Sequence, residues 1–548
     1  MKIISLLFTF TLLFILLVLM QSVFNPLFLW EELIYHFETF DLRGLAKGSI
    51  YLGTYLLAVI PFIIVVGVRS FKLFSLLSFI IFIFLSMDFF IQFLGVTHGF
   101  SLAEYALGIN EMGNYKYLIV YTDTILKAML LASVFIFILY IVRVKVCRIR
   151  LDAKYLLLIL LPTSIIYGGC HRIDTFKLSS YPAALKFPAI AVEHLGRTTP
   201  MVDRILNDDI EVESAGKFKN IVWIIDESVT GTYLSVNGYS KDTTPYLKSL
   251  EQETKKFSNF GVVNSISNCS GTSNLFLRVG LNPNTNDNAK DALSNIPTIF
   301  QYAKRAGYKT WLMDSQTRKD HLQNYLTLYD RDDIDHFETL GPEVTRVDRD
   351  KEFLNTLSTI VNNKKSNDKN FIVLVKYGAH FPYLLTYEQQ NSPFTPVLGS
   401  SYGGMDMEHK EEQVNTYLNS LYFNTDLYLK ELIEKVDLSQ SVVFYTSDHG
   451  QNILEEASLS RPHCNTEIVV KNEVSVPLMV FNDDAEFIFP SDKNLFYSQI
   501  QMFPTTLSLL GYKKELVAKY GKTLAEGFKT SEERKYILSS SFEVKAYK

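Results

Sequence analysis

The apolar residues of the chain form two patterns, long uncharged runs before residue 171 and short runs with polar flanks after it. No charged residue occurs between residues 3 and 30, and further apolar stretches cover 48–68, 73–96, about 122–142 and 155–170. About 20 apolar residues cross the ~30 Å hydrocarbon core of a bilayer, so the pattern predicts five membrane-spanning helices. The first lacks a small-x-small cleavage site, which favours an uncleaved helix over a signal peptide.

The loops between these stretches differ in charge, which predicts an orientation. Cations follow the second and fourth stretches, at Arg69, Lys72, Arg143, Lys145, Arg148, Arg150 and Lys154. The loops on the opposite side carry mainly Asp and Glu. Because loops rich in Lys and Arg stay in the cytoplasm, we expect a cytoplasmic N-terminus and an extracytoplasmic location for everything after Cys170.

Short apolar runs alternate with helical patterns beyond residue 216. Buried strands are predicted at 220–225, 310–313, 371–377, 441–445 and 477–481, and helices at 245–256, 299–306, 351–362, 411–436 and 503–510. This alternation predicts an α/β fold in which a mostly parallel sheet carries helices on both faces. The expected domains are a five-helix transmembrane domain at 1–170, a connector along the membrane surface at 171–216, and an extracytoplasmic domain at 217–548.

Composition excludes several classes of protein. Aromatic residues make up 14% of the chain and charged residues only 20%, whereas disordered proteins are poor in aromatics and rich in charge. The net charge of −5 gives no reason to expect nucleic-acid binding, which needs a concentrated basic surface. Four cysteines in 548 residues are too few for a disulfide-rich scaffold.

Three of the predicted strands are followed by carboxylate or imidazole side chains. Asp226 and Glu227 follow the first strand, His380 follows the third, and Asp448 and His449 follow the fourth. Ligands of parallel sheets bind beyond the carboxyl ends of the strands, so we expect these side chains to share one edge. Oxygen and nitrogen donors of this kind suit Zn²⁺. A single acidic residue after a strand is also a common turn or capping residue, and this alternative stays open.

A loop rich in hydroxyl groups is predicted at 264–278 (NSISNCSGTSNLFLR), where Ser, Asn and Gly give way to apolar residues. This pattern is typical of a loop that enters a helix, whose first amide groups suit an anionic phosphate. Ser270, Thr272 and Ser273 are candidate nucleophiles, and each needs a base or a metal to lower the pKa of its hydroxyl. The alternative is a cluster that only caps the helix.

Several segments resemble the membrane phosphoethanolamine transferases, which belong to the sulfatase and alkaline phosphatase superfamily. The segment 226–247 is similar to their metal-binding opening, and 447–450 matches their Ser-Asp-His-Gly element. The other similar segments are 269–273, 311–316, 377–382, 422–426, His463 and 503–505. The resemblance covers nearly the whole chain, and the predicted membrane anchor agrees with it.

The resemblance implies an alkaline phosphatase-like domain with a zinc-dependent transferase activity. Zn²⁺ would be held by Glu227, Asp448 and His449 and by the oxygen of Thr272, the expected nucleophile. Thr272 would take phosphoethanolamine from phosphatidylethanolamine and pass it to an envelope glycolipid, either lipid A or the lipopolysaccharide core. The protein would be a monomer that crosses the bacterial inner membrane several times, with its catalytic domain in the periplasm.

Two histidines complete the site that the resemblance implies. His380 and His463 would bind phosphate oxygens or protonate the leaving group, since imidazole titrates near neutral pH. Asp226 stands where many lipid A-modifying members have Gly, so it would be either a further metal ligand or a supporting residue.

Two of the cysteines lie beside residues of the site that the resemblance implies. Cys269 lies three residues before Thr272, and Cys464 directly follows His463. If the site is assembled as expected, these two cysteines would lie close enough for a disulfide in an oxidising compartment, or they would remain two separate thiols. Cys147 lies in a predicted cytoplasmic loop and should stay reduced.

Three other functions remain as alternatives. A sulfatase needs a Cys or Ser followed by Pro and Arg for conversion to formylglycine, whereas Ser-Gly-Thr-Ser follows Cys269. A phosphoglycerol transferase would use the same superfamily chemistry and a threonine nucleophile. A non-catalytic envelope protein with a degenerate domain would bind no zinc.

Overall fold

The computed structural model describes residues 2–22, 59–93, 122–147, 149–155 and 204–547, together with Ser49, Gly53 and Leu56. The last range has gaps at 208, 254–255, 286–295, 318–321, 342, 400–406, 456–461, 466–468, 485–491 and 540–541. The chain divides into two compact units, a helical unit (Met1–Thr198 with Ser400–Met405) and an α/β unit (Thr199–Gly399 with Asp406–Lys548). Most of the connector predicted for 171–216 lies outside the described residues.

Four helices make up the described part of the helical unit: α1 (Lys2–Ser22), α4 (Val59–Gly67), α5 (Phe71–Phe93) and α7 (Thr122–Ile141), which continues as a π-helical turn, η2 (Val142–Val146). Two of them, at Phe71–Phe90 and Thr122–Val146, are long and apolar enough to cross a membrane. They coincide with the third and fourth predicted stretches. The first and second stretches are described in part, and the fifth lies outside the described residues apart from Tyr155.

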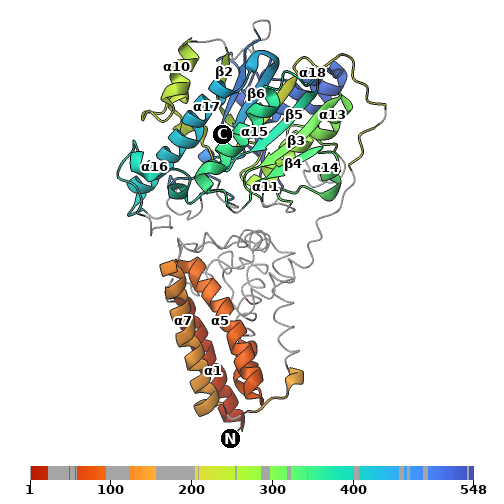
Figure 1. Ribbon diagram of the computed structural model, residues 1–548. Coiled ribbons are helices and arrows are strands. Elements are labelled where there is room, and N and C mark those ends of the chain that lie inside the picture. The colour runs from red at the N-terminus through yellow and green to blue at the C-terminus, as the bar shows by residue number, and fades with distance from the viewer. Residues whose placement is uncertain are drawn as a thin grey trace. The chain divides into compact units, whose positions relative to one another are not determined.

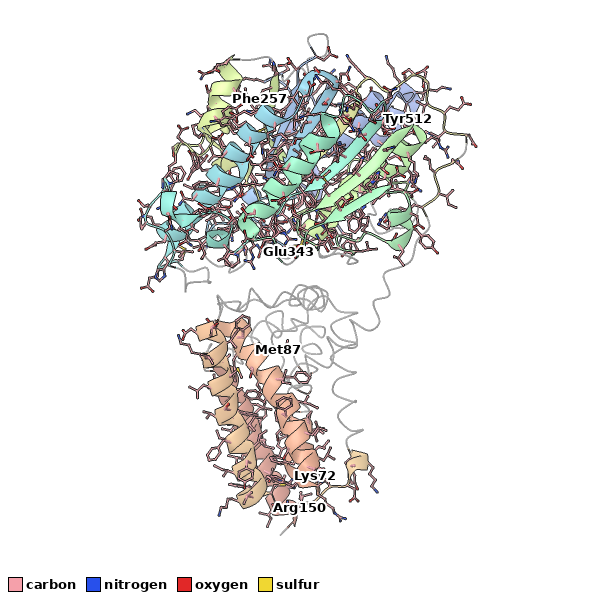
Figure 2. The ribbon with its side chains drawn as sticks, viewed as in Figure 1. Lys72, Met87, Arg150, Phe257, Glu343 and Tyr512 are labelled. Carbon is pink, nitrogen blue, oxygen red and sulfur yellow. A yellow bond between two sulfur atoms is a disulfide. The ribbon has the colours of Figure 1, made fainter. Side chains whose placement is uncertain are left out.

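The helices of this unit pack through small and aromatic side chains. Ala128 and Ala132 are fully buried on α7, and the rings of Phe62 and Phe135 meet edge to face at 5.6 Å. The exposed Lys127 forms an ion pair with Asp123, one turn earlier, at 2.7 Å. Figure 2 shows Lys72 and Arg150 at one end of this unit, the end at which Figure 1 marks the N-terminus.

A seven-stranded sheet forms the centre of the α/β unit (Figure 1). Its strands are β1 (Asn220–Asp226), β2 (Phe257–Asn264), β3 (Tyr308–Asp314), β4 (His336–Thr339), β5 (Lys369–Val375), β6 (Ser441–Ser447) and β7 (Ser475–Asn482). The spatial order is β2-β7-β6-β1-β5-β3-β4. Strands β6, β1, β5, β3 and β4 run parallel to one another, whereas β7 runs antiparallel to both β6 and β2. The sheet is therefore mixed, because the predicted strand at 477–481 runs in the opposite direction.

Helices cover both faces of this sheet. They are α10 (Pro245–Glu253), α11 (Ser270–Val279), α13 (Ile299–Arg305), α14 (Leu328–Asp332), α15 (Arg346–Val361), α16 (Lys410–Leu421), α17 (Tyr428–Lys435), α18 (Met502–Leu510) and α19 (Lys514–Tyr520). Alternate side chains of β1 enter opposite cores: Trp223 packs with the core of α11, α13 and α18, and Val222 with the core of α15, α16 and α17. A π-helical turn, η9 (Tyr422–Leu427), joins α16 to α17, so the helix predicted for 411–436 is continuous. A small antiparallel pair, β8 (Lys535–Ile537) and β9 (Val544–Ala546), lies near the C-terminus.

Candidate active site

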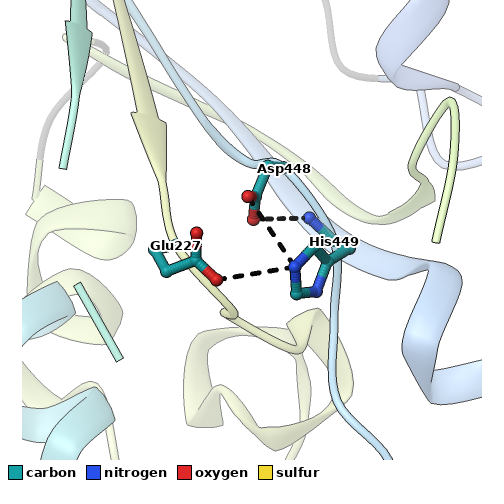
Figure 3. A group of neighbouring side chains, drawn as sticks. All are labelled: Glu227, Asp448 and His449. Atoms are coloured by element: carbon teal, nitrogen blue, oxygen red, sulfur yellow. Dashed lines mark hydrogen bonds and ion pairs between the residues drawn. The ribbon is translucent and has the colours of Figure 1, made fainter. Parts of the chain in front are cut away.

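The ends of β1 and β6 bring together the three predicted metal ligands (Figure 3). These strands are parallel neighbours, with Asp226 paired to Ser447. Glu227, Asp448 and His449 follow directly, and their ligand atoms lie within 4.8 Å of one another. All three side chains are at least 99% buried. The expectation that strand ends would collect these groups at one edge is confirmed for these three residues.

The donor atoms of this group fit a metal ion. The Nδ1–H of His449 donates to the Gly450 carbonyl at 2.8 Å, so its lone pair is on Nε2, 3.5 Å from Glu227 Oε1 and 3.7 Å from Asp448 Oδ2. Asp448 Oδ1 accepts two backbone N–H groups, but Asp448 Oδ2 is buried with no hydrogen-bond partner among the described residues. A buried carboxylate oxygen beside an imidazole lone pair is a favourable site for Zn²⁺.

The electrostatics of the group also favour a bound cation. Burial raises the pKa of Asp448 well above its ordinary value, and the neighbouring charge of Glu227 raises it further. Burial has the opposite effect on His449, whose pKa it lowers, so the neutral, metal-binding form of this imidazole is favoured. Two buried carboxylates side by side repel each other, and a divalent cation between them would offset that repulsion.

Glu227 is held in place by side chains from other segments. Gln316 Nε2 donates to Glu227 Oε2 at 2.9 Å and to the Lys376 carbonyl at 2.8 Å. Ser228 has a left-handed backbone (φ 65°), and its hydroxyl donates to Glu227 Oε1 at 2.5 Å. A non-glycine residue in this conformation is strained, and such strain is common at functional sites. Gln316 lies in the segment 311–316, which resembles the transferase family, but its contact with Glu227 could not be predicted from the sequence.

Asp226 supports the site, and its carboxylate is fully engaged elsewhere. Asp226 Oδ2 accepts from Lys376 Nζ and from the Tyr445 hydroxyl, both at 2.6 Å, and Oδ1 accepts from the Glu227 amide at 2.9 Å. Lys376 and Asp226 are both completely buried. Of the two roles left open for Asp226, the structure favours the supporting one. Lys376 is a residue that the sequence analysis missed, although a lysine inside the apolar run 371–377 was the available signal.

The hydroxyl that faces the metal-ligand group is that of Ser270, the first residue of α11. Ser270 Oγ lies 3.0 Å from His449 Nε2 and 3.3 Å from Glu227 Oε2. Thr272 Oγ1 instead contacts Ser267 Oγ at 2.7 Å and donates to the Cys269 carbonyl at 3.1 Å. Successive helical residues are about 100° apart, so residues 270 and 272 project in nearly opposite directions. Of the two, Ser270 is therefore the hydroxyl that lies next to the predicted metal ligands, and Thr272 as metal-binding oxygen and nucleophile stays a prediction without such a contact.

The two predicted histidines lie beside this group. The His463 ring stacks on the His449 ring at 4.2 Å, and its Nδ1 lies 3.2 Å from Gln451 Nε2. The Nδ1–H of His380 donates to the Phe381 carbonyl at 2.6 Å. Burial alone would raise the pKa of Glu227, but electrostatic interactions with the nearby imidazoles of His449 and His380 bring that pKa below its ordinary value.

A disulfide joins Cys269 to Cys464, with the two Cα atoms 4.8 Å apart. It links the residue before Ser270 to the residue after His463. Of the two alternatives that the sequence left open for these cysteines, the structure has the bridge, and Cys147 is a free, buried thiol as expected. Cys170 lies outside the described residues.

Comparisons with known proteins give one consistent result. Residues 219–512 match the family model described as Sulfatase. The chain is 23% identical over 309 residues to the Kdo(2)-lipid A phosphoethanolamine 7''-transferase of Escherichia coli K12, covering 53% of this chain and 51% of that protein. It is 24% identical over 387 residues to the phosphatidylethanolamine transferase Mcr-1 of Escherichia coli, covering 66% of this chain and 68% of that protein. The aligned part of the chain thus spans about half the length of the first of these relatives.

A solved membrane protein shares the fold of nearly the whole chain. The integral membrane protein lipooligosaccharide phosphoethanolamine transferase A (EptA) of Neisseria meningitidis superposes with a TM-score of 0.60. The match covers 94% of this chain and 99% of that protein at 16% sequence identity. The likeness therefore extends through the helical unit as well as the α/β unit.

Proposed function

Because this chain belongs to the sulfatase family, we propose that it is a zinc-dependent transferase that moves phosphoethanolamine from phosphatidylethanolamine to an envelope glycolipid. The observation that carries the proposal is the position of Ser270 Oγ, 3.0 Å from His449 Nε2 at the edge of a buried carboxylate pair. The names of the relatives support the transferred group and the lipid donor and acceptor.

Glu227, Asp448 and His449 would hold the Zn²⁺ ion. When bound there, zinc would act as a Lewis acid that lowers the pKa of a nearby hydroxyl and balances negative charge on phosphate oxygens. The protein's own contribution is to bury the ligands, to fix Glu227 through Gln316 and to keep Nε2 of His449 unprotonated.

Ser270 would act as the nucleophile of a two-step transfer. Its hydroxyl loses a proton and Oγ attacks the phosphorus of phosphatidylethanolamine; the bond from phosphorus to the glycerol oxygen breaks, and diacylglycerol leaves after taking up a proton. Phosphoethanolamine is then carried on Ser270 Oγ. In the second step an acceptor hydroxyl or phosphate attacks the same phosphorus, the bond to Oγ breaks, and Ser270 regains its proton.

The backbone around Ser270 suits a phosphorylated substrate. Ser270 begins α11, a helix of ten residues (Ser270–Val279), and the first amides of a helix attract anions. His380 and His463 are the candidates for proton exchange with the leaving and attacking oxygens. With its Nδ1–H bonded to Phe381, neutral His380 carries its lone pair on Nε2. The resemblance implies a second role for these histidines, the binding of phosphate oxygens, and we propose the two roles as alternatives.

The proposed setting is the bacterial inner membrane, with five membrane-spanning helices and a periplasmic catalytic unit. Helices α5 and α7 and the fold shared with a membrane protein support an anchor of this kind. Donor and acceptor are both lipids, so a site held at the bilayer surface raises their effective concentration. Lipid A or the lipopolysaccharide core is the proposed acceptor, and we expect the protein to act as a monomer.

Mass spectrometry of envelope glycolipids tests this function directly. Cells that produce the protein should contain glycolipid enlarged by one phosphoethanolamine group, and cells that produce Ser270→Ala should not. Purified protein incubated with phosphatidylethanolamine should carry the same group covalently. A glycerol phosphate adduct would identify the protein as a phosphoglycerol transferase instead. An unmodified protein without bound zinc would contradict both transferase functions.

A further inference from the structure

The Ser270 loop (residues 268–270) and the His463 loop (residues 463–465) are joined by more than the disulfide. The backbone amide of Cys464 donates to the Asn268 carbonyl at 3.0 Å, beside the bridge from Cys269 to Cys464. Asn268 is completely buried, so its polar atoms need partners within the protein. The contact between the two loops therefore has a polar part besides the two sulfur atoms.

The side chain at the centre of this polar part is Glu473, which comes from a third segment. Glu473 belongs to the short 3-10 helix η11 (Lys471–Val474) and is completely buried. Its Oε2 accepts from the Asn465 backbone amide at 3.2 Å and, over a longer distance of 3.4 Å, from Asn268 Nδ2. Its Oε1 accepts from Asn465 Nδ2 at 2.7 Å and from the Val470 amide at 3.1 Å. One carboxylate thus bonds to both loops at once.

The two asparagines also bond to each other, which closes a triangle with Glu473. Asn268 Nδ2 donates to the Asn465 carbonyl at 2.9 Å. The backbone carbonyl of Glu473 accepts from the amide of Gly450, the residue after the predicted ligand His449, at 2.8 Å. The triangle therefore connects three parts of the site, namely the start of α11, the His463 loop and the loop that carries His449.

The four N–H donors around Glu473 explain why a carboxylate stands at this position. Both oxygens of an ionised carboxylate accept, whereas an amide side chain has one accepting oxygen and would turn an NH₂ group towards two of these donors. A hydrogen bond to an ionised acceptor is also stronger than a bond between neutral groups. Glu473 is therefore suited to hold segments together, and not only to fill space between them.

We propose that Glu473 is a positioning residue, which holds the Ser270 loop against the His463 loop independently of the disulfide. The roles of Ser270 and His463 rest on the proposed function, but the connection between their loops does not. The carboxylate and the disulfide then act as two parallel connections. Either one alone keeps Ser270 Oγ beside His449 Nε2, and the loops separate only when both connections are lost.

This arrangement predicts that Glu473 and the disulfide are coupled. Two thiols that other contacts hold side by side form a bridge at a higher effective concentration. Each bridge formed converts one oxidised glutathione into two reduced ones. The square of the reduced glutathione concentration, divided by the oxidised concentration at which half of the protein is bridged, therefore measures the preference for the bridge. A residue that only stabilises the folded domain leaves this quotient unchanged, because the protein is folded with or without the bridge.

A glutathione titration of the full chain in nanodiscs tests the connection without reference to activity. Glu473→Ala should lower the quotient at least about tenfold, since it removes four hydrogen bonds to a buried carboxylate. Glu473→Gln keeps one accepting oxygen and should lower it less, and this variant supplies the test if Glu473→Ala does not fold. Mass spectrometry of alkylated peptides measures the bridged fraction of Cys269 and Cys464 separately from Cys147.

Asp426→Asn is the matched control for this titration. Asp426 is also a buried carboxylate, and it accepts the backbone amides of Tyr246 and Leu247, both at 3.0 Å, but it touches neither loop of the site through these bonds. Its replacement should leave the quotient unchanged. An unchanged quotient for the Glu473 variants, or an equal shift for Asp426→Asn, would overturn the proposal.

A second measurement connects the two loops to the proposed reaction. Cys269→Ser/Cys464→Ser and Glu473→Ala should each keep kcat within several-fold of unsubstituted protein, because one connection remains. The three changes together should reduce kcat by far more than the product of the two separate losses. Losses that simply multiply would overturn the positioning role. If unsubstituted protein transfers no phosphoethanolamine, the proposed function fails, while the glutathione titration still decides the connection.

Discussion

The hydroxyl of Ser270 lies 3.0 Å from Nε2 of His449, whereas the hydroxyl of Thr272, two residues later, donates to the Cys269 carbonyl. This difference predicts which hydroxyl forms the covalent intermediate. Ser270→Ala should reduce transfer by at least about 10³-fold, as loss of a catalytic nucleophile does in other enzymes. Ser270→Thr should keep a measurable part of the activity, because it retains a hydroxyl at the start of α11.

Thr272→Ala is the control for this experiment. It removes two local hydrogen bonds and should cost about 1 kcal/mol of stability with most of the activity retained. Intact-mass analysis after incubation with phosphatidylethanolamine locates the adduct. A phosphoethanolamine group on Thr272, together with an active Ser270→Ala protein, would contradict the assignment.

The second prediction concerns metal affinity. Gln316 Nε2 donates to Glu227 Oε2, so Gln316→Ala should weaken zinc binding by about 10- to 100-fold while the three proposed ligands remain. His449→Ala should lose zinc altogether, and Ser270→Ala should retain it, since three ligands are left. Zinc content after dialysis against a graded chelator distinguishes these cases. Equal zinc retention by His449→Ala and unsubstituted protein would argue against this site.

The third prediction concerns the buried pair beneath the site. Lys376→Met leaves Asp226 buried without its cation, which should destabilise the α/β unit by about 3–5 kcal/mol. The double variant Lys376→Met/Asp226→Asn removes both charges and should recover a large part of that loss. The thermal unfolding transition of the α/β unit is the measurement. Asp226→Asn is measured alone as well. If the stability losses of Lys376→Met and Asp226→Asn simply add in the double variant, the two residues are not coupled.

The fourth prediction is a pH dependence of stability that arises from Glu473. Burial raises the pKa of Glu473 from 4.5 to about 7, although hydrogen bonds from Asn465, Val470 and Asn268 oppose the rise. The folded state therefore binds this proton more tightly than the unfolded state. Its contribution to stability is complete below pH 4.5 and is lost as the pH rises towards 7.

Glu473→Gln has no proton to release and should remove this contribution to the pH dependence. Between about pH 4.5 and 7 the unfolding free energy of unsubstituted protein should fall relative to that of the variant, by at most about 1.4 kcal/mol per pH unit. Unfolding at a series of pH values measures the slope. Parallel curves for the two proteins would show that Glu473 does not titrate in this range.

Much of the α/β fold could be predicted from the sequence because buried strands give short, continuous apolar runs. The strands β1, β3, β5, β6 and β7 all have such runs. Two strands of the seven-stranded sheet were missed: β2 (FSNFGVVN) is interrupted by polar residues and Gly261, and β4 (HFET) is a short edge strand with polar side chains. The direction of β7 was not predictable either, because an apolar run carries no information about the direction of its neighbours.

The residues of the site also fall into those that could be predicted from the sequence and those that could not. Glu227, Asp448 and His449 could be predicted because each follows a strand, and the topology of the sheet gathers strand ends at one edge. The choice between Ser270 and Thr272 depended on the residue at which α11 begins, and local sequence fixes helix ends only to within one or two residues. The bond from Lys376 to Asp226 joins residues 150 apart in sequence, so only the tertiary structure could reveal it.

The disulfide between Cys269 and Cys464 joins positions separated by 195 residues, so it cannot close until most of the α/β unit has been synthesised. With that unit outside the cytoplasm, as proposed, both thiols must also be exported before they meet an oxidising environment. A chain still on the ribosome or retained in the cytosol would therefore lack the covalent link between the Ser270 loop and the His463 loop. Under that proposal, the covalent link between the two loops of the site forms only after export.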